Sequence, residues 1–495
     1  MFVQDALKLL VLARTIKNIF APINRVPPEI LSLISDYCSG DELVALTHVC
    51  RSWREIFISR PSSWGFLDCL NLDRTRTYLE RSKTSLLEIR VETDRIHHDV
   101  FLVAISHTRR LKALTLSGSS HSILVLTRHI ASLVSPAPLL EKLEICVRAH
   151  PSAAIQNTLF EGDLRSLREL RLVGVITDMP WRNLSNLQTF HLRLMSARVT
   201  SVTRLLDFFE HAPLLREIKL MDCLPGSSDA PAVRVVSLPR LRLLGIAFES
   251  AHSVLLNHLR IPTGASVTLE VFFEGYESPL LNCLPRSLDN LDNISHITSV
   301  HLNFGSGINL RLEGPSGDLC ITDSWDHAES TTPIHSILLS LNSLPISTTK
   351  RFTIAHWDAS VRLYHEWFAA CQTLRLMNDI RTLTLTDCSN LSLFIALNPY
   401  QATNSVLCPE LEELVLCTQA RPDDLFIVEL LEMVKGRASW DVGLSSFVIE
   451  CPLELGPLDK LFGLRSYVEH VEHRLDSDTP GMGRVAGCVC SGRWD

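Results

Sequence analysis

The residues that could carry out chemistry are numerous in this sequence, but their spacing matches no metal-binding motif. Nineteen histidines and fourteen cysteines offer ligands and nucleophiles. His97 and His98 are adjacent, so their side chains point in different directions on a helix or strand, and no HExxH motif is present. Cys488 and Cys490 are the closest pair of cysteines, and they have no further ligands nearby. The sequence therefore predicts no metal site.

Motifs for nucleotide binding and hydrolysis are also missing. The stretch Gly305-Ser306-Gly307 is a lone GxG without the helix fingerprint of a nucleotide site. There is no GxSxG nucleophile elbow and no P-loop. We therefore expect no catalytic residues and no cofactor, and we predict that the chain is not an enzyme.

Composition and charge exclude several classes of protein. A hydrophobic fraction of 46% with 21% charged residues describes a globular protein, and 495 residues exceed one ordinary core. Asp and Glu outnumber Lys and Arg by 55 to 47, so the chain as a whole has no basic excess for nucleic acid. The cysteines are sparse, which predicts reduced thiols in the cytoplasm or nucleus. The sequence has no uninterrupted apolar run of about 18 residues, so we predict no membrane span.

Residues 1–22 predict an N-terminal amphipathic helix that packs beside the segment that follows. A signal peptide is not expected, because the apolar run Leu9–Ala13 is too short and charged residues border it on both sides. A mitochondrial presequence remains the alternative. The apolar residues of one helical face are Phe2, Ala6, Leu9, Leu10, Ala13, Ile16 and Phe20.

Residues 23–57 predict three short helices with more apolar side chains than so small a unit can hide. Pro27 and Pro28 mark the first helix start, because proline suits the first turn, and Glu29 complements the positive helix end. Asp41 is the predicted N-cap of the second helix. The third helix is expected over Arg51–Ser59. The expected apolar residues of the three helices are Ile30, Leu31, Leu33, Ile34 and Tyr37, then Leu43, Leu46 and Val49, and then Trp53, Ile56 and Phe57.

The size of this segment predicts a protein partner. A unit of about 40 residues seldom stays folded without a metal, a disulfide or a partner. Burial of four such side chains against a partner would contribute roughly 6–12 kcal/mol before entropic costs. Since no metal ligands cluster here, a partner is the simplest explanation.

This pattern resembles the F-box, the module that docks receptors of cullin–RING ubiquitin ligases onto a Skp-family adaptor. Val26 stands where the family usually has leucine, and the continuation from Pro61 to Val91 is similar to F-box proteins of mushroom-forming fungi. The resemblance implies an F-box over residues 23–66, a linker helix over 67–85, and adaptor contacts from Pro28 and Ile30. Trp53 either contacts the adaptor or packs within the three helices. The full set of adaptor-binding residues that it implies is Pro27, Pro28, Glu29, Ile30, Ile34, Leu46, Val49, Cys50 and Trp53.

A leucine-rich phrase repeats through residues 86–470. It is clearest in LRSLRELRL (164–172), LSNLQTFHL (184–192) and CPELEELVL (408–416). Its recurrence at about 27 residues, or two to three times that, is typical of leucine-rich repeats, in which stacked units form a parallel sheet. Regularity decays over 247–380, where irregular repeats are expected, and 471–495 is predicted to be a flexible tail. Strands are predicted near residues 89, 114, 143, 170, 190, 218, 244, 300, 383 and 414.

Two features of the repeats bear on function. Cys223 and Cys388 follow predicted strands where such repeats place a small buried side chain, so we expect structural thiols. Arg171, His191 or Arg193, and Lys219 would lie on the concave side, on neighbouring strands about 4.8 Å apart. Such a basic ladder would suit an acidic or phosphorylated substrate, although Glu169 and Glu217 would neutralise it if the face is merely solvated.

The predicted fold class is an α/β solenoid, with a three-helix F-box followed by an irregular leucine-rich-repeat horseshoe. By its resemblance, the chain is expected to be the substrate-recognition subunit of an SCF-type ubiquitin ligase. Its partners would be a Skp-family adaptor, through it a cullin, and an unknown protein substrate, with neither nucleic acid nor membrane. The alternative is a leucine-rich-repeat scaffold without a role in degradation.

Overall fold

The structure is a computed structural model of the 495-residue chain. The chain divides into two compact units, Met1–Ser196 and Ala197–Asp495. The residues that the structure describes are 2–147, 153–155, 159–177, 183–194, 201–223, 230, 233–248, 255–271, 283–285, 287–305, 307–324, 334–356, 363–388, 391–400, 406–418, 424–450 and 463–474.

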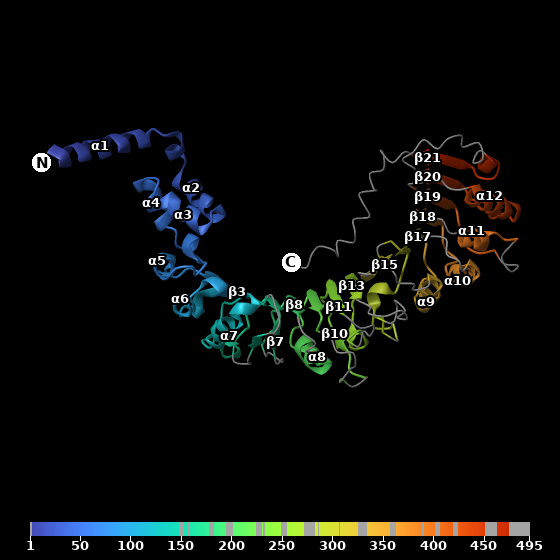
Figure 1. Ribbon diagram of the computed structural model, residues 1–495, viewed down its shortest axis with the longest axis horizontal. Helices are drawn as coiled ribbons and strands as arrows, with labels where there is room; N and C mark the ends of the chain where they lie inside the picture. Colours follow the sequence, from blue (N-terminus) through green and yellow to red (C-terminus); the bar gives the residue numbers. More distant parts are fainter. Residues whose placement is uncertain are drawn as a thin grey trace. The chain divides into compact units, whose positions relative to one another are not determined.

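The first unit begins with helices (Figure 1). Ser39 caps the helix Gly40–Thr47. Its hydroxyl accepts a hydrogen bond from the Glu42 N–H, and the Glu42 carboxylate accepts one from the Ser39 N–H. The predicted N-cap, Asp41, instead lies in the first turn, because the Ser-x-x-Glu spacing forms a reciprocal capping box two residues earlier. These elements are α1 (Phe2–Ile19), η1 (Pro22–Arg25), α2 (Pro28–Ile34), η2 (Ser35–Tyr37), α3 (Gly40–Thr47), α4 (Arg51–Ile58) and η3 (Pro61–Trp64).

A small core holds α2, α3 and α4 together. Leu31, Leu43 and Phe57 are buried in it. Trp64 is also buried, and its indole N–H donates to the carbonyl of Phe57 at 2.9 Å. The core therefore extends from the helices to the segment that enters the sheet.

The sheet of the first unit is parallel, and its strands follow one another in chain order. The first strand follows the helical core directly in the chain, and its residue Phe66 pairs with Glu88. The predicted strands near residues 89, 114, 143, 170 and 190 are confirmed. The paired strands are β1 (Phe66–Leu67), β2 (Leu87–Glu92), β3 (Leu111–Gly118), β4 (Lys142–Val147), β6 (Glu169–Val173) and β8 (Thr189–Arg193).

Helices and short elements connect these strands. A separate parallel pair joins β5 (Ala153–Ile155) to β7 (Val175–Thr177). The connecting elements are α5 (Leu72–Ser82), η4 (Thr93–Arg95), α6 (His98–Ile105), η5 (Thr108–Arg110), η6 (Ser120–Ser122), α7 (Ile123–Ala131) and η7 (Leu159–Gly162).

The second unit has a longer sheet, and one strand in its middle runs against the others. The predicted strands near residues 218, 244, 300, 383 and 414 are confirmed. In spatial order the strands are β9 (Glu217–Met221), β11 (Leu243–Phe248), β13 (Ala265–Val271), β16 (Gly317–Ser324), β15 (Gly307–Gly314), β14 (Ser299–Asn303), β17 (Arg351–Ala355), β18 (Thr382–Thr386), β19 (Glu413–Cys417), β20 (Ser446–Glu450) and β21 (His470–Arg474).

The reversed strand is β15, which is antiparallel to both β14 and β16. The chain passes from β13 to β14, returns through β15 and β16 to lie beside β13, and resumes at β17 beside β14. Irregular repeats were expected over 247–380, but this reversal was not. Gly305 and Gly307 of the lone GxG lie at the turn between β14 and β15.

Helices also connect the strands of the second unit (Figure 1). The outer helices predicted at 365–374 and 422–436 fall within α10 and α12, although residues 422 and 423 lie outside the described residues. The connecting elements are α8 (Val202–Glu210), β10 (Val236–Ser237), η8 (Leu256–His258), β12 (Leu259–Arg260), η10 (Asp292–Ile294), α9 (Ile334–Ser340), η11 (Leu341–Ser343), α10 (Leu363–Leu376), α11 (Ser392–Leu397), α12 (Asp424–Ser439) and η12 (Gly463–Ser466).

Side chains alternate along the strands between a buried face and a partly exposed face. In β6, Leu170 and Leu172 are buried, whereas Glu169 and Arg171 are half-buried. Cys223 is buried after β9 as expected, and burial strongly raises the pKa of its thiol, whereas Cys388 is only half-buried. The architecture is therefore α/β with mostly parallel sheets, which is compatible with the predicted solenoid.

Two predicted segments differ at their edges. The tail was expected from residue 471, but β21 runs to Arg474, because His470–Arg474 pairs in register with β20. Residues 475–495, with Cys488 and Cys490, lie outside the described residues. Within the described ranges, none of the helices has both the length and the hydropathy to cross a bilayer.

Candidate functional site

An apolar stripe along α2 and η2 is the main candidate for a binding surface. Ile30 and Leu33 are each 50% exposed, and Tyr37 is 90% exposed. Ile34 is also exposed. The four positions are spaced i, i+3, i+4 and i+7, so they share one side of the helix, while Leu31 turns inward. An exposed apolar row of this kind is typical of a protein-binding surface.

The start of α2 borders this stripe. Pro27 occupies the N-cap position and Pro28 begins the helix, so the missing proline N–H costs no hydrogen bond. Glu29 lies in the first turn, where a carboxylate complements the helix dipole. All three side chains are exposed. The predicted residues Pro27, Pro28, Glu29 and Ile30 therefore lie at the accessible start of α2, and Ile34 is exposed at its last position.

The predicted contacts on α3 and α4 separate into three kinds. Val49 is exposed after α3, and Leu46 and Cys50 are half-buried. Trp53 is only 8% exposed and packs edge to face on Phe57, with 5.8 Å between ring centroids. Of the two alternatives for Trp53, the structure thus shows packing within the core of the three helices.

Two exposed residues of the stripe were absent from the predicted contacts. Leu33 and Tyr37 belong to the same helical run as Ile30 and Ile34. The spacing of the four positions was the available signal. It identifies a common face, but the burial of Leu31 is needed to show that this face points outward.

Charged groups beside the stripe are held in place. Arg60 joins Asp36 through an ion pair of 2.8 Å and also donates to the carbonyl of Ser32. Hydrogen bonds from the backbone N–H and hydroxyl of Ser39 lower the pKa of Glu42. The stripe is thus bordered by fixed charges, which would orient a partner rather than supply most of its affinity.

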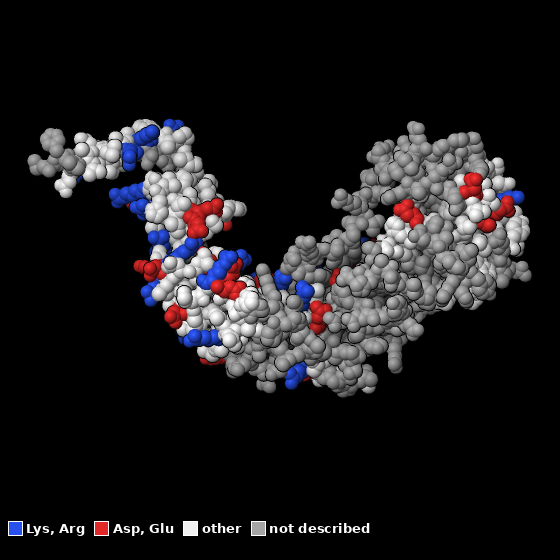
Figure 2. Space-filling view, viewed as in Figure 1, with Lys and Arg blue, Asp and Glu red and all other residues white. Residues whose placement is uncertain are grey.

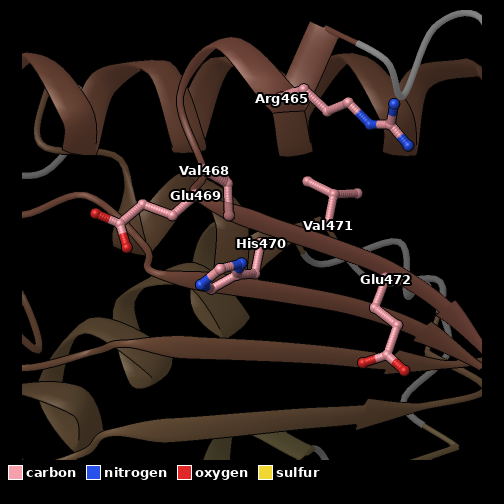
Figure 3. Close-up of a pocket in the computed structure, with 6 residues that line it drawn as sticks. All are labelled: Arg465, Val468, Glu469, His470, Val471 and Glu472. Carbon is pink, nitrogen blue, oxygen red and sulfur yellow. The ribbon is translucent and has the colours of Figure 1, made fainter.

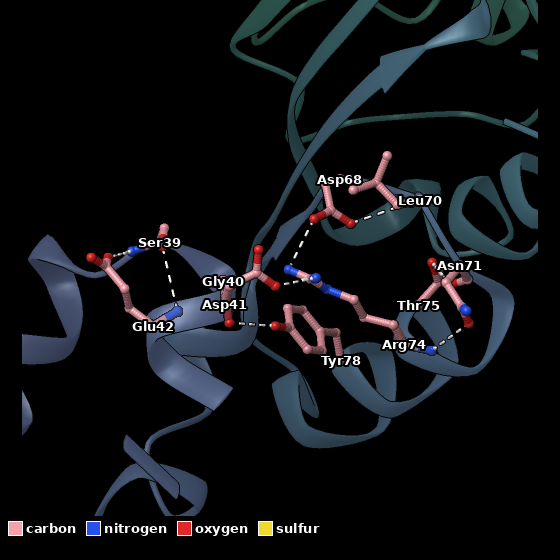
Figure 4. Close-up of polar contacts among 10 residues, drawn as sticks. All are labelled: Ser39, Gly40, Asp41, Glu42, Asp68, Leu70, Asn71, Arg74, Thr75 and Tyr78. Carbon is pink, nitrogen blue, oxygen red and sulfur yellow. Dashed lines mark hydrogen bonds and ion pairs between the residues drawn. The ribbon is translucent and has the colours of Figure 1, made fainter. Parts of the chain in front are cut away.

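A polar junction ties α3 to α5 (Figure 4). Arg74 on α5 reaches Asp41 at 2.5 Å and Asp68 at 3.0 Å. The hydroxyl of Tyr78 donates to the carbonyl of Gly40 at 2.8 Å. In the sequence, β1 lies between α3 and α5, and it pairs with β2. The candidate binding surface is therefore connected to the sheet through paired and hydrogen-bonded segments.

The predicted basic ladder is partly assembled on the exposed face of the sheet. Arg171 of β6 lies opposite His191 of β8 in the parallel register, and Val173 lies opposite Arg193. Lys219 lies on β9 of the second unit. The structure therefore places Arg171, His191 and Arg193 on adjoining strands of one unit.

Acidic side chains accompany these cations. Arg171 lies 3.7 Å from Glu144, and Lys219 lies 2.8 Å from Glu217. Glu169 pairs with Lys142 at 2.7 Å. The face is consequently mixed in charge, as the alternative of a solvated face anticipated.

A stacked histidine pair joins α6 and α7, with His129 buried and His98 half-buried. The rings of His98 and His129 are stacked with centroids 5.1 Å apart, and His129 also contacts Phe101 at 4.4 Å. Among the residues that the structure describes, neither nitrogen of His129 has a hydrogen-bond partner, and burial lowers its pKa to about 4. Across the described parts of the chain, no group of three or more His, Cys, Asp or Glu could hold a metal ion.

An open pocket lies at β21 and η12, with a volume of about 530 Å³ (Figure 3). Glu469 and Glu472 lie at opposite ends of the view, with His470 between them and Arg465 above. Glu472 is engaged by Arg474 at 2.8 Å, which lowers the pKa of this carboxyl. The pocket is a polar hollow at the sheet edge, and its groups do not converge on one point.

Comparison with known proteins bears on the N-terminal helices. No curated protein matches the chain. Residues 23–69 match the family model described as F-box-like, and this range contains α2, α3, α4, β1 and the apolar stripe. F-box domains generally bind Skp-family adaptors, and their proteins are generally non-catalytic substrate receptors. The chain therefore carries an F-box-like domain at residues 23–69.

Proposed function

We propose that the protein is the substrate-recognition subunit of an SCF-type cullin–RING ubiquitin ligase. The F-box-like domain docks a Skp-family adaptor, and through it a cullin, while the sheets hold a protein substrate. The protein contributes proximity rather than bond-making, because it raises the effective concentration of the substrate near the charged ubiquitin. It acts in the cytoplasm or nucleus.

The exposed stripe within the F-box-like match is the observation that carries this proposal. Ile30, Leu33, Ile34 and Tyr37 are exposed over α2 and η2. Each such side chain, once buried by a partner, contributes roughly 1.5–3 kcal/mol of transfer free energy. The stripe therefore has the apolar area of a binding centre, and Pro28 and Glu29 border it.

The sheets serve as the substrate-binding part, as irregular leucine-rich repeats of the kind found in fungal F-box proteins. Arg171 and His191 lie on neighbouring strands, so an acidic or phosphorylated segment would meet two donors about 4.8 Å apart. Charge reversal at Arg171 and Arg193 tests this preference. Substrate capture should fall, whereas reversal at the exposed Arg168 should leave it intact. Unchanged capture in the double variant would remove the preference.

A scaffold without a role in degradation is the second candidate, since the same stripe would still bind the adaptor. The difference lies in whether a cullin joins the assembly. Recovery of both adaptor and cullin with the protein supports the ligase receptor. Recovery of the adaptor alone supports the scaffold.

Affinity capture under proteasome inhibition tests the main proposal. Ile30→Asp/Leu33→Asp places two charges in the stripe, so adaptor recovery should fall at least tenfold, which corresponds to about 1.4 kcal/mol or more. Leu102→Asp is the matched control, because Leu102 is an exposed leucine on α6, outside the F-box-like match. Substrates held by the sheets should remain bound in both variants. Equal adaptor recovery from the double variant and wild type would overturn the proposal.

A further inference from the structure

The helix α1 leaves its apolar side chains uncovered. Leu9 and Phe20 are each 67% exposed, and Leu10 and Ile16 are each 49% exposed. The sequence predicted that this face would pack beside the next segment. In the structure these four side chains are exposed, three of them on α1 and Phe20 directly after its last residue.

The charge of α1 is opposite in sign to that of the whole chain. The helix carries three basic residues, Lys8, Arg14 and Lys17, and one acidic residue, Asp5. Asp5 pairs with Lys8 at 3.6 Å. The complete chain has a net charge of −8. The visible surface of α1 in Figure 2 is mainly uncharged, with basic side chains along it.

Two of the three basic residues flank the apolar face. At about 100° per residue, Leu12, Ile16, Leu9, Phe20 and Leu10 span an arc of about 160°. Lys8 and Arg14 each lie about 40° beyond an edge of this arc, one on either side, whereas Lys17 and Asp5 each lie about 20° inside an edge. Long basic side chains at these positions can extend to anionic groups while their stems cover apolar surface. This is the arrangement of a helix that lies flat in a membrane interface.

We propose that α1 is an interfacial helix that binds the surface of an anionic bilayer. The charge of the helix complements anionic headgroups, and the exposed arc inserts at the acyl boundary. The proposal does not rest on adaptor binding, because the α2 stripe and α1 are separate surfaces.

A second copy of the chain fits this helix less well. The positions spaced as a coiled-coil seam are Ala6, Leu9, Ala13, Ile16 and Phe20. Two of the five are alanines, which leave little to interlock between helices, and α1 has only 18 residues. A narrow seam would also leave Leu12 uncovered. A bilayer covers the whole arc.

Flotation of the purified full-length chain with lipid vesicles tests the proposal. The chain should float with phosphatidylcholine vesicles that contain phosphatidylserine at least tenfold more than with phosphatidylcholine alone, and added salt should weaken this binding. Leu9→Asp/Ile16→Asp should reduce flotation at least tenfold. The control Leu124→Asp changes a leucine that is 83% exposed on α7, and it should float as wild type does.

A second variant separates charge from insertion. Arg14→Gln/Lys17→Gln keeps the apolar arc, so it should lose the preference for anionic vesicles. Absence of flotation with either vesicle, or flotation unchanged in Leu9→Asp/Ile16→Asp, would overturn the proposal. A concentration-dependent dimer that this double variant abolishes, without vesicle binding by the wild type, would assign the face to a second copy instead.

Discussion

Arg74 on α5 donates a hydrogen bond to Asp41 in the first turn of α3, with 2.5 Å between Nη1 and Oδ1. The same guanidinium reaches Asp68, which follows β1, at 3.0 Å from Nη2. One side chain therefore joins three segments: a helix of the F-box-like domain, the segment after the first strand, and the helix that precedes β2.

Removal of this guanidinium should loosen the junction. Arg74→Ala is expected to lower the free energy of unfolding by roughly 1–2 kcal/mol. Most of this loss should come from Asp68, because the Asp41 side chain is 85% exposed and its ion pair is screened by water. Urea unfolding of the full-length chain measures the change. Arg76→Ala, at an exposed position of the same helix, is the control, and an equal loss there would contradict a special role for Arg74.

A side chain at Gly40 should displace the guanidinium of Arg74 from its ion pairs. A Cβ at this position would lie 2.6 Å from Nη2 of Arg74 and 3.2 Å from the hydroxyl of Tyr78. Gly40→Ala should therefore destabilise the wild type despite the better helix propensity of alanine. In the Arg74→Ala background the closest atom is gone, so the same change should cost about 1 kcal/mol less. A double-mutant cycle measures this difference, and additive effects would rule out the contact.

Trp53 and Ile30 should behave in opposite ways. Trp53→Ala empties a buried site and is expected to lower stability by roughly 3–5 kcal/mol. Ile30→Ala removes an exposed side chain, so stability should change by less than about 0.5 kcal/mol while adaptor binding weakens. Chemical unfolding and adaptor titration on the same samples separate the two effects. A stable Trp53→Ala protein with weakened binding would return Trp53 to the adaptor surface.

His129 should make the first unit sensitive to acid. Burial lowers the pKa of His129 to about 4 from an ordinary value of 6.5, with smaller contributions from His98 and Arg128. Burial and Arg128 also lower the pKa of the neighbouring His98, against a smaller opposite effect of Asp99. The unfolded chain therefore binds a proton that the folded chain resists, so stability is unaffected above about pH 6.5 and falls as the pH drops toward 4. At pH 5 the loss from this group is about 2 kcal/mol.

Replacement of the ring tests the origin of that sensitivity. His129→Leu should flatten the dependence of stability on pH between 7 and 5, since no proton can bind there. His97→Leu is the control, because His97 is exposed at the start of α6, and it should leave the profile unchanged. A profile that stays as steep in His129→Leu would assign the acid sensitivity to other groups.

The strands were predictable from sequence because one residue pattern decides them. Leu170 and Leu172 alternate with polar residues, so a shift of the strand by one residue would turn both leucines toward the exposed face. The reversed β15 was not predictable, because Ile308, Leu310 and Leu312 alternate equally well in a parallel or an antiparallel strand. Direction depends on pairing with residues distant in the sequence.

The candidate site was predictable in composition but not in orientation. The apolar positions of the first helical segment are evident, yet Leu31 is buried and Leu33 is exposed. Tryptophan fits a core or an interface equally well, so only packing on Phe57 identifies the role of Trp53. The predicted N-cap was Asp41, although the Ser-x-x-Glu spacing of Ser39 and Glu42 is a local signal for the capping box that forms.

The β15–β16 hairpin has a consequence for how this protein tolerates change in length. Without it, β13 and β14 would become direct parallel neighbours, as the other consecutive strands of the sheet are. Its two strands instead separate β13 from β14 by about three strand spacings, or roughly 14 Å. The hairpin is thus a two-strand insertion in an otherwise regular series of parallel strands. Its deletion would shorten the sheet by two strands and leave the order of the other strands unchanged.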